Sequence, residues 1–258
     1  DDLLVSAESI QAPQSDDDVV VRLTDVHKAF GSKQILRGVS FELLRGRCLG
    51  IMGGSGTGKS VTLRHIIGLM RPDQGKVEVM GRDLAEVTRE ELQEMRKRIG
   101  YVFQEGALIN WLTVAENLAL PLQENTKLSK SEIESKVQEK LALVHIPDAG
   151  AKFPSEISGG MKKRVGLARA LITDPELILY DEPNAGLDPE ISRSINHLMR
   201  EVSETLNVTS LVVEHRIECI KTVADEVIFL YDGKVHVHAP VDEFFHSQDS
   251  VLKGFLGI

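Results

Sequence analysis

Short apolar runs alternate with amphipathic stretches along most of this chain. Residues 177–180, 209–213 and 227–230 are rich in apolar side chains, as expected of parallel strands that are buried on both faces. The segments between these runs have helical periodicity, and residues 47–52 form a similar short run nearer the N-terminus. This alternation predicts an α/β fold with a largely parallel sheet and helices on its faces.

Two other regions differ from this core. Strand-like runs at 19–23 and 35–44, and a strand–turn pattern at 75–81, predict a β-rich N-terminal subdomain. Residues from about 105 to 170 are mostly helical in pattern. Within them, the stretch 130–143 is charged on one helix face and apolar on the other. We therefore expect a main domain at 19–235, with a helical subdomain inserted at about 105–170.

A glycine-rich segment follows the predicted strand at 47–52. It fits the phosphate-binding pattern G-x-x-x-x-G-K-[ST] and consists of Gly53, Gly54, Ser55, Gly56, Thr57, Gly58, Lys59 and Ser60. Leu63, Ile66, Ile67 and Met70 then recur at helical spacing. Such a loop turns its N–H groups toward an anion at the positive end of a helix. The pattern therefore predicts a nucleotide-binding loop that extends to Val61.

Within this loop, Lys59 is expected to reach the β and γ phosphates and Ser60 to ligate Mg²⁺. Asp181 and Glu182 directly follow the apolar run at 177–180, and ligand groups of open α/β sheets lie at the carboxyl ends of strands. An acidic pair at a strand end is more often a solvated turn. Beside a phosphate loop, we instead expect Asp181 to hold Mg²⁺ and Glu182 to accept a proton from the attacking water.

A second glycine motif, Ser158-Gly159-Gly160, precedes a strong helix-forming segment. Ser158 is expected to cap that helix, and a capped helix after a glycine turn is a sufficient explanation of the motif. The alternative is that Ser158 and the amides of Gly159 and Gly160 face a phosphate at the helix N-terminus. The motif alone leaves both possibilities open.

Composition limits the remaining classes. With 42% hydrophobic and 27% charged residues the chain is an ordinary globular protein, and its net charge of −9 argues against a nucleic-acid partner. Cys48 and Cys219 lie in apolar segments, which favours buried thiols in a reducing compartment. The acidic segment 1–18 is expected to be disordered and shows no secretory signal pattern. These features indicate a soluble intracellular protein.

In order and spacing, the motifs resemble those of ABC-transporter ATPases from about residue 19 to 235. The resemblance rests on the phosphate loop, Gln104 in Tyr-Val-Phe-Gln, Ser158-Gly159-Gly160, Tyr-Asp-Glu-Pro at 180–183, Ala-Gly-Leu-Asp at 185–188, and His215. It implies a P-loop NTPase fold with ATP and Mg²⁺ as ligands.

The same resemblance assigns roles to single residues. Phe30 would stack on adenine, although by itself it would be placed in the core. Gln104 would link the metal and γ-phosphate to a transmembrane partner and act in catalysis. His215 would contact the γ-phosphate as a switch histidine, although a lone histidine there is usually a polar strand end. Asp188 would communicate across a head-to-tail dimer that encloses two ATP–Mg²⁺, with Ser158 contacting the partner's nucleotide.

The chain departs from the commonest family pattern at a few positions. Met161 replaces Gln, Asn184 replaces Thr, Glu214 and Arg216 replace Thr and Asp around the histidine, and Gly54 stands where Pro or Glu is frequent. None of these changes removes a side chain that is expected to bind phosphate, bind the metal or accept a proton, so we expect ATP hydrolysis to be retained.

The segment from Ser158 to Arg164 resembles the signature of ATPases that serve MCE/Mla-type phospholipid transporters, including the chloroplast system. Residues 103–108 and 112–117 are similar to the same group, whereas Asn110 and Trp111 differ from it. The C-terminal extension at 236–258 also resembles that group, although a plain docking helix explains it nearly as well. The resemblance implies a permease and an MCE-domain protein as partners, and a peripheral location on the cytoplasmic face of the inner membrane.

Two alternatives remain open. An importer ATPase for a small polar solute shares every catalytic motif. A soluble ABC ATPase acting on ribosomes or DNA is disfavoured by the single cassette, by the compact segment between Gln104 and Ser158, and by the net charge of −9.

Overall fold

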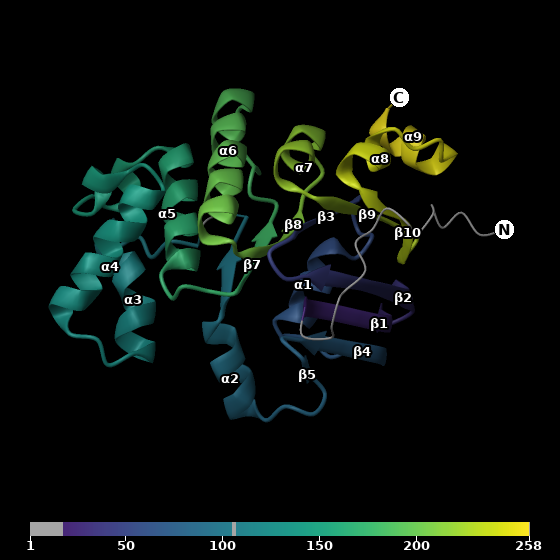
Figure 1. The fold of residues 1–258 in the computed structure, drawn as a ribbon, viewed down its shortest axis with the longest axis horizontal. Helices are drawn as coiled ribbons and strands as arrows, with labels where there is room; N and C mark the ends of the chain where they lie inside the picture. The colour runs from purple at the N-terminus through teal and green to yellow at the C-terminus, as the bar shows by residue number, and fades with distance from the viewer. Residues whose placement is uncertain (1–17, 105–106, 258) are drawn as a thin grey trace.

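The computed structural model describes residues 18–104 and 107–257, and in these ranges the chain forms two β-sheets with helices packed around the larger one (Figure 1). The expected disorder of residues 1–18 lies almost wholly outside the described residues. The α/β fold class is the one predicted from the apolar pattern.

The larger sheet has six strands in the order β10-β9-β3-β8-β7-β6. Its pairs are parallel except at the β10 edge. The strands are β3 (Cys48–Gly53), β6 (Ile99–Val102), β7 (Leu177–Asp181), β8 (Thr209–Val213), β9 (Glu226–Tyr231) and β10 (Lys234–Pro240). In β7, Ile178 and Tyr180 pack into one apolar cluster and Leu177 and Leu179 into another. Both faces of the strand are therefore buried, as the sequence predicts.

The smaller, antiparallel sheet has the order β2-β1-β4-β5. It comprises β1 (Val19–Phe30), β2 (Lys33–Leu44), β4 (Gln74–Val79) and β5 (Arg82–Asp83). Its apolar side chains share one cluster with α1 (Lys59–Ile66), with Met95 of α2 (Arg89–Lys97) and with one face of the large sheet. This sheet is the predicted β-rich subdomain, and it lies on the opposite side of the molecule from α3 to α5 (Figure 1).

The helical segment is inserted between β6 and β7. It contains α3 (Val114–Asn125), α4 (Lys130–Leu143), two 3₁₀ turns (Pro147–Ala149 and Pro154–Glu156) and α5 (Gly159–Leu171). Capping boxes start α3 at Thr113 and α4 at Ser129. Ile133, Val137 and Leu141 are all buried, so the amphipathic pattern at 130–143 gives both the limits and the inner face of α4.

The remaining helices are α6 (Pro189–Leu206), α7 (Ile217–Val223), α8 (Val241–Phe245) and α9 (Ser250–Leu256). The expected boundary at residue 235 falls inside β10, which pairs with β9 as far as Pro240. Phe244 of α8 and Leu252 of α9 are fully buried in the main core. The start of the C-terminal extension is therefore an integral part of the large sheet, and its helices pack on the same core.

Three smaller expectations can also be compared with the structure. Cys48 and Cys219 are both buried free thiols, and burial raises the pKa of each. The helix after the glycine loop ends at Ile66, before Met70, because Gly68 takes a left-handed backbone conformation with φ 67°. Among the described residues, no helix has the length and apolarity needed to cross a membrane.

Candidate active site

The glycine-rich loop connects β3 to α1 near the middle of the large sheet. Gly56 and Gly58 have φ angles of 76° and 104°, a region that favours glycine. A Cβ atom on Gly58 would lie 2.4 Å from Cδ2 of Leu36, so a side chain there would displace Leu36 of β2. Ser55 and Gly56 are exposed at the outer side of the loop. This conformation presents backbone amides for phosphate binding.

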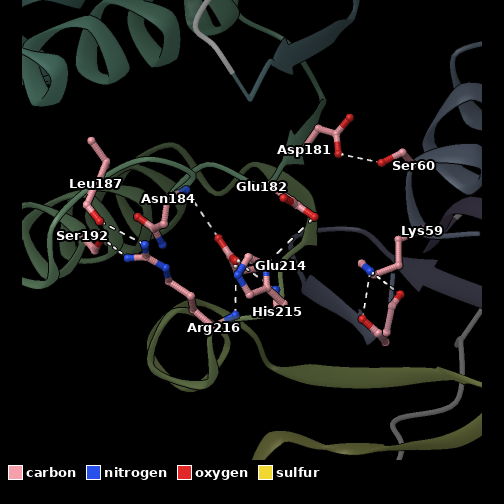
Figure 2. Close-up of polar contacts among 12 residues, drawn as sticks. Lys59, Ser60, Asp181, Glu182, Asn184, Leu187, Ser192, Glu214, His215 and Arg216 are labelled. Atoms are coloured by element: carbon pink, nitrogen blue, oxygen red, sulfur yellow. Dashed lines mark hydrogen bonds and ion pairs between the residues drawn. The ribbon is translucent and has the colours of Figure 1, made fainter. Parts of the chain in front are cut away.

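Lys59 is the first residue of α1, and its side chain folds back along the loop. Its ammonium donates hydrogen bonds to the carbonyl oxygens of Gly53 at 2.8 Å and Gly54 at 2.9 Å (Figure 2). The residue is only 8% exposed. Burial lowers the pKa of Lys59, and the nearby carboxylates of Glu182, Asp181 and Glu214 act in the opposite direction. The structure thus brings the predicted phosphate-binding lysine to the predicted acidic groups.

Ser60 and Asp181 meet beside this lysine. The Ser60 hydroxyl donates to Oδ1 of Asp181 at 3.1 Å, and the Tyr101 hydroxyl donates to Oδ2 at 3.0 Å. Burial, followed by the Asp181 carboxylate, raises the pKa of Tyr101, so this hydroxyl remains a proton donor. A serine hydroxyl beside a carboxylate is the oxygen-rich donor set that Mg²⁺ prefers. Both residues therefore suit the metal site predicted for them.

Gln104 is the third predicted metal residue, and it lies in the exposed segment after β6. Its backbone carbonyl accepts a hydrogen bond from the Lys163 ammonium of α5. Within residues 18–104 and 107–257, no hydrogen bond joins the Gln104 side chain to Ser60 or Asp181. Its assigned role in metal binding and catalysis remains a prediction.

Glu182 directly follows Asp181 and has a left-handed backbone with φ 48°. Its N–H donates to the carbonyl oxygen of Val213 at 2.9 Å, which ties this strained residue to the end of β8. Such a backbone conformation costs about 1–3 kcal/mol and is common at functional sites. The Glu182 side chain is 25% exposed, and Oε1 lies 4.0 Å from Nδ1 of the half-exposed His215 (Figure 2). A carboxylate that reaches solvent beside the loop can accept a proton from water.

The second glycine motif, Ser158-Gly159-Gly160, starts α5 in the helical insertion and not in the large sheet. Ser158 caps α5, as predicted, since its hydroxyl accepts from the Met161 N–H at 3.2 Å. Gly159 is exposed, whereas a Cβ on the buried Gly160 would lie 2.8 Å from Cγ2 of Ile191. Gly160 therefore also allows α5 to pack closely against α6. In the described part of the chain, no hydrogen bond links Ser158 to the phosphate loop.

Asp188 and Phe30 are the other two nucleotide-related positions. Asp188 is exposed and caps α6 by accepting from the N–H groups of Glu190 at 3.0 Å and Ile191 at 2.9 Å. Phe30 ends β1 and is 49% exposed, with the Lys28 ammonium 5.9 Å from its ring centroid. Phe30 is thus not a core residue, and its exposed ring can stack on a base.

Four further residues of this region did not stand out in the sequence as site residues. Tyr101 binds Asp181, Lys163 binds the Gln104 carbonyl, and Glu214 and Arg216 make a network around His215. The sequence offered few signals for them. Tyr101 lies near a strand end, Lys163 belongs to the basic run after Ser158-Gly159-Gly160, and Glu214 and Arg216 are the two departures from the family pattern beside His215.

A phosphate loop followed by a helix, an Mg²⁺-suited Ser–Asp pair and an acceptor carboxylate at a strand end define a P-loop nucleoside triphosphate hydrolase. The profile of the family described as ABC transporter matches residues 36–185. The chain belongs to this family. Its domain is accordingly an ABC-type ATPase that binds ATP together with Mg²⁺, and when bound the metal neutralises phosphate charge as it develops.

Curated relatives are similar over nearly the whole chain. The probable ribonucleotide transport ATP-binding protein mkl of Mycobacterium bovis is 40% identical over 92% of this chain, which spans 66% of that protein's length. Protein TRIGALACTOSYLDIACYLGLYCEROL 3, chloroplastic, of Arabidopsis thaliana is 40% identical over 94% of this chain and 74% of its own. The methionine import ATP-binding protein MetN of Rhizobium johnstonii is 40% identical over 98% and 70%, respectively.

A solved structure shows the same architecture. The ATP-binding cassette MJ0796, determined as a dimer in a post-hydrolysis state with ADP and Pi, superposes with a TM-score of 0.77 at 32% identity and covers 86% of this chain and 98% of its own. That likeness extends the family assignment to the three-dimensional fold.

Proposed function

We propose that this chain is the ATPase subunit of a transporter that moves phospholipid between membranes, acting as a homodimer on a separate permease. The observation that carries the lipid part is the segment Ser158–Arg164 at the start of α5, which resembles the signature of MCE/Mla-type ATPases. In this proposal the partners are a second copy of the chain, a permease and an MCE-domain lipid-binding protein, and the complex lies on the cytoplasmic face of the inner membrane.

The dimer follows from the separation of the two phosphate-binding elements. Ser158 is exposed at the start of α5, and no hydrogen bond of the described residues joins it to the loop around Lys59. An exposed helix N-terminus favours an anion. We infer that it meets the nucleotide held by a second copy, so that ATP bridges the two chains and hydrolysis at Glu182 releases them. The dimeric form of MJ0796 supports this arrangement.

Exposed apolar side chains at Leu69, and at Phe103 and Trp111 in the segment of the chain around Gln104, support a docking surface for the permease. Leu69 is 64% exposed, Phe103 44% and Trp111 80%. A hollow of about 770 Å³ is lined by Leu69, Met70, Phe103 and Asp181, among others. It therefore connects Leu69 and Phe103 to Asp181 of the proposed metal site, a path along which docking and hydrolysis would be coupled.

Relatives named for three different cargoes are equally similar to this chain. The chloroplast relative carries a glycolipid in its name, the mycobacterial one a ribonucleotide and the Rhizobium one methionine, and all three are 40% identical to this chain. The methionine relative is the specific reason to keep a polar-solute importer as the second candidate. An ATPase subunit does not contact cargo, so the partners have to identify the system.

The test is affinity purification of the Glu182→Gln variant from its native membranes with ATP and Mg²⁺, followed by mass spectrometry. A multi-span permease together with an MCE-domain protein supports lipid transport. A permease with a solute-binding protein would favour the importer instead. Recovery with ribosomes or DNA alone would contradict the transporter role.

A further inference from the structure

A buried carboxylate lies next to the switch histidine. Glu214 directly follows β8, and its side chain has no exposed surface. Its carboxylate accepts hydrogen bonds from the N–H groups of Asn184, His215 and Arg216 at 3.4, 2.9 and 3.2 Å. Nδ1 of His215 lies 3.3 Å from the same carboxylate. A buried carboxylate is strongly destabilising without such donors. These hydrogen bonds therefore fix the backbone of His215 and Arg216 just after the end of β8.

Arg216, on the other side of the histidine, joins this loop to the start of α6. Its Nη2 donates to the Leu187 carbonyl at 3.0 Å and its Nη1 to the Ser192 hydroxyl at 2.5 Å (Figure 2). Leu187 immediately precedes Asp188, the cap of α6, and Ser192 is only 4% exposed. A guanidinium group offers its donors in one rigid plane. It therefore holds the two segments at a fixed separation.

Asn184 closes the network from the catalytic side. It lies two positions after Glu182, its N–H donates to Glu214, and its Nδ2 donates to Oδ1 of the buried Asn196 in α6 at 2.6 Å. The segment that carries the acceptor carboxylate and the loop that carries the histidine are thus both anchored to the same helix.

We propose that Glu214 and Arg216 form a brace that positions the His215 imidazole relative to the Leu187–Asp188 turn during ATP hydrolysis. Both are positioning residues, because they act through the histidine and the turn. The residue types matter, since an aspartate in place of Arg216 could not donate to the Leu187 carbonyl and a threonine in place of Glu214 would offer no carboxylate. The brace rests on the ATPase assignment and is independent of the cargo.

The kinetic consequence is a loss in turnover with little loss in nucleotide binding. For Arg216→Gln we expect kcat to fall about tenfold, because displacing a catalytic group by an ångström can cost up to about a hundredfold. The Kd for ATP should stay within about twofold, since neither phosphate-loop nor adenine contacts change. Arg216→Lys keeps the charge but offers a single donor nitrogen, so its kcat should lie between those of wild type and Arg216→Gln. Arg193→Gln is the matched control: it changes an exposed arginine of α6, the helix that Arg216 contacts, and it should behave as wild type.

A double-mutant cycle separates positioning from general damage. If Arg216 acts through His215, Arg216→Gln should lower kcat by less than about twofold when His215 is already Ala, because coupled residues are not additive. An undiminished tenfold loss in that background would overturn the brace. So would parallel changes in kcat and Kd in the single variant.

Hydrogen–deuterium exchange of the nucleotide-free chain tests the brace without relying on turnover. Arg216→Gln should accelerate exchange in residues 185–192 and 214–217 and leave 130–143 unchanged. Unchanged exchange in the first two segments would overturn the brace. A wild-type chain that fails to hydrolyse ATP, while the exchange prediction holds, would contradict the ATPase assignment and leave Glu214 and Arg216 with a structural role only.

Discussion

The Ser60 hydroxyl lies 3.1 Å from Oδ1 of Asp181, although the two residues are 121 positions apart in the chain. The contact exists because β3 and β7 lie on either side of β8 in the parallel sheet, so the loop after β3 and the end of β7 reach the same edge. The helical insertion lies between them in sequence without disturbing this edge. A metal site and a proton acceptor are thereby assembled from two distant motifs.

This pair predicts a specific defect in metal dependence. Asp181→Asn removes one negative charge beside the Ser60 hydroxyl, so the variant should need at least about tenfold more Mg²⁺ for half-maximal ATPase activity. A magnesium titration of the steady-state rate measures it. Asp242→Asn, on the surface helix α8, is the control. An unaltered magnesium requirement in Asp181→Asn would remove Asp181 from the metal site.

The exposed ring of Phe30 predicts its contribution to nucleotide affinity. Base stacking on an aromatic side chain is worth about 1–3 kcal/mol, so Phe30→Ala should weaken ATP binding by about tenfold, with little change in kcat at saturation. Fluorescent-nucleotide titration is the measurement. Phe153→Ala removes another exposed phenylalanine, 41% accessible, and should bind ATP normally. Equal affinities of the two variants would rule out the stacking role.

The buried Lys140 of α4 predicts a pH-dependent contribution to stability. Its ammonium lies 2.6 Å from Oδ1 of Asp174, in the loop before β7, and Lys136 approaches the other oxygen. Burial alone would raise the pKa of Asp174, but the bonds to Lys136 and Lys140 outweigh it and lower this pKa. Because the folded-state pKa is the lower one, this stabilisation is present above about pH 4 and is lost as the pH falls through the lowered pKa.

The Asp174 side chain is 55% exposed, so solvent screens these pairs, and Asp174→Asn should lower the free energy of unfolding by about 0.5–1 kcal/mol at pH 7, with a smaller difference below pH 4. Thermal unfolding at several pH values checks this. Glu139→Gln removes the other, 63% exposed partner of Lys140 and should cost less. A loss that does not shrink at low pH would contradict the ion-pair explanation.

Trp111 is the most exposed large hydrophobic residue of the described chain, at 80%, and it tests the proposed permease surface. Trp111→Ala should reduce transport in a reconstituted complex several-fold while basal ATPase activity of the isolated chain stays near wild type. Leu206→Ala, at the far end of α6, is the control. Parallel loss of transport and basal ATPase activity would count against a docking role.

Sequence patterns predicted the elements whose signal is local. The apolar runs gave β7, β8 and β9, and the periodicity at 130–143 gave α4 with its buried Ile133, because each follows a simple burial period. The end of α1 was missed, since Met70 continues the helical spacing and only the left-handed Gly68 stops it. In β10 the polar His236 and His238 obscured the strand, and they are accommodated by Asp249 and Glu226 at 3.1 and 3.0 Å.

The site shows the same division. Motifs located Lys59, Ser60, Asp181 and Glu182 because phosphate and metal chemistry restricts residue type and spacing. The buried Glu214 was not predicted, since a glutamate after a strand is usually solvated. Its burial becomes understandable only when the amides of Asn184, His215 and Arg216 converge on it in three dimensions.

The most direct test of the central claim is the behaviour of the Glu182→Gln variant with ATP and Mg²⁺. Removal of the proton acceptor should lower the ATPase rate by about 10²–10⁴-fold while ATP still binds. Light scattering on a sizing column should then show a dimer with ATP and a monomer without nucleotide, and Glu90→Gln, on the surface of α2, should hydrolyse ATP like wild type. Undiminished hydrolysis by Glu182→Gln, or a monomer in saturating ATP, would contradict a two-chain ATPase that closes on nucleotide.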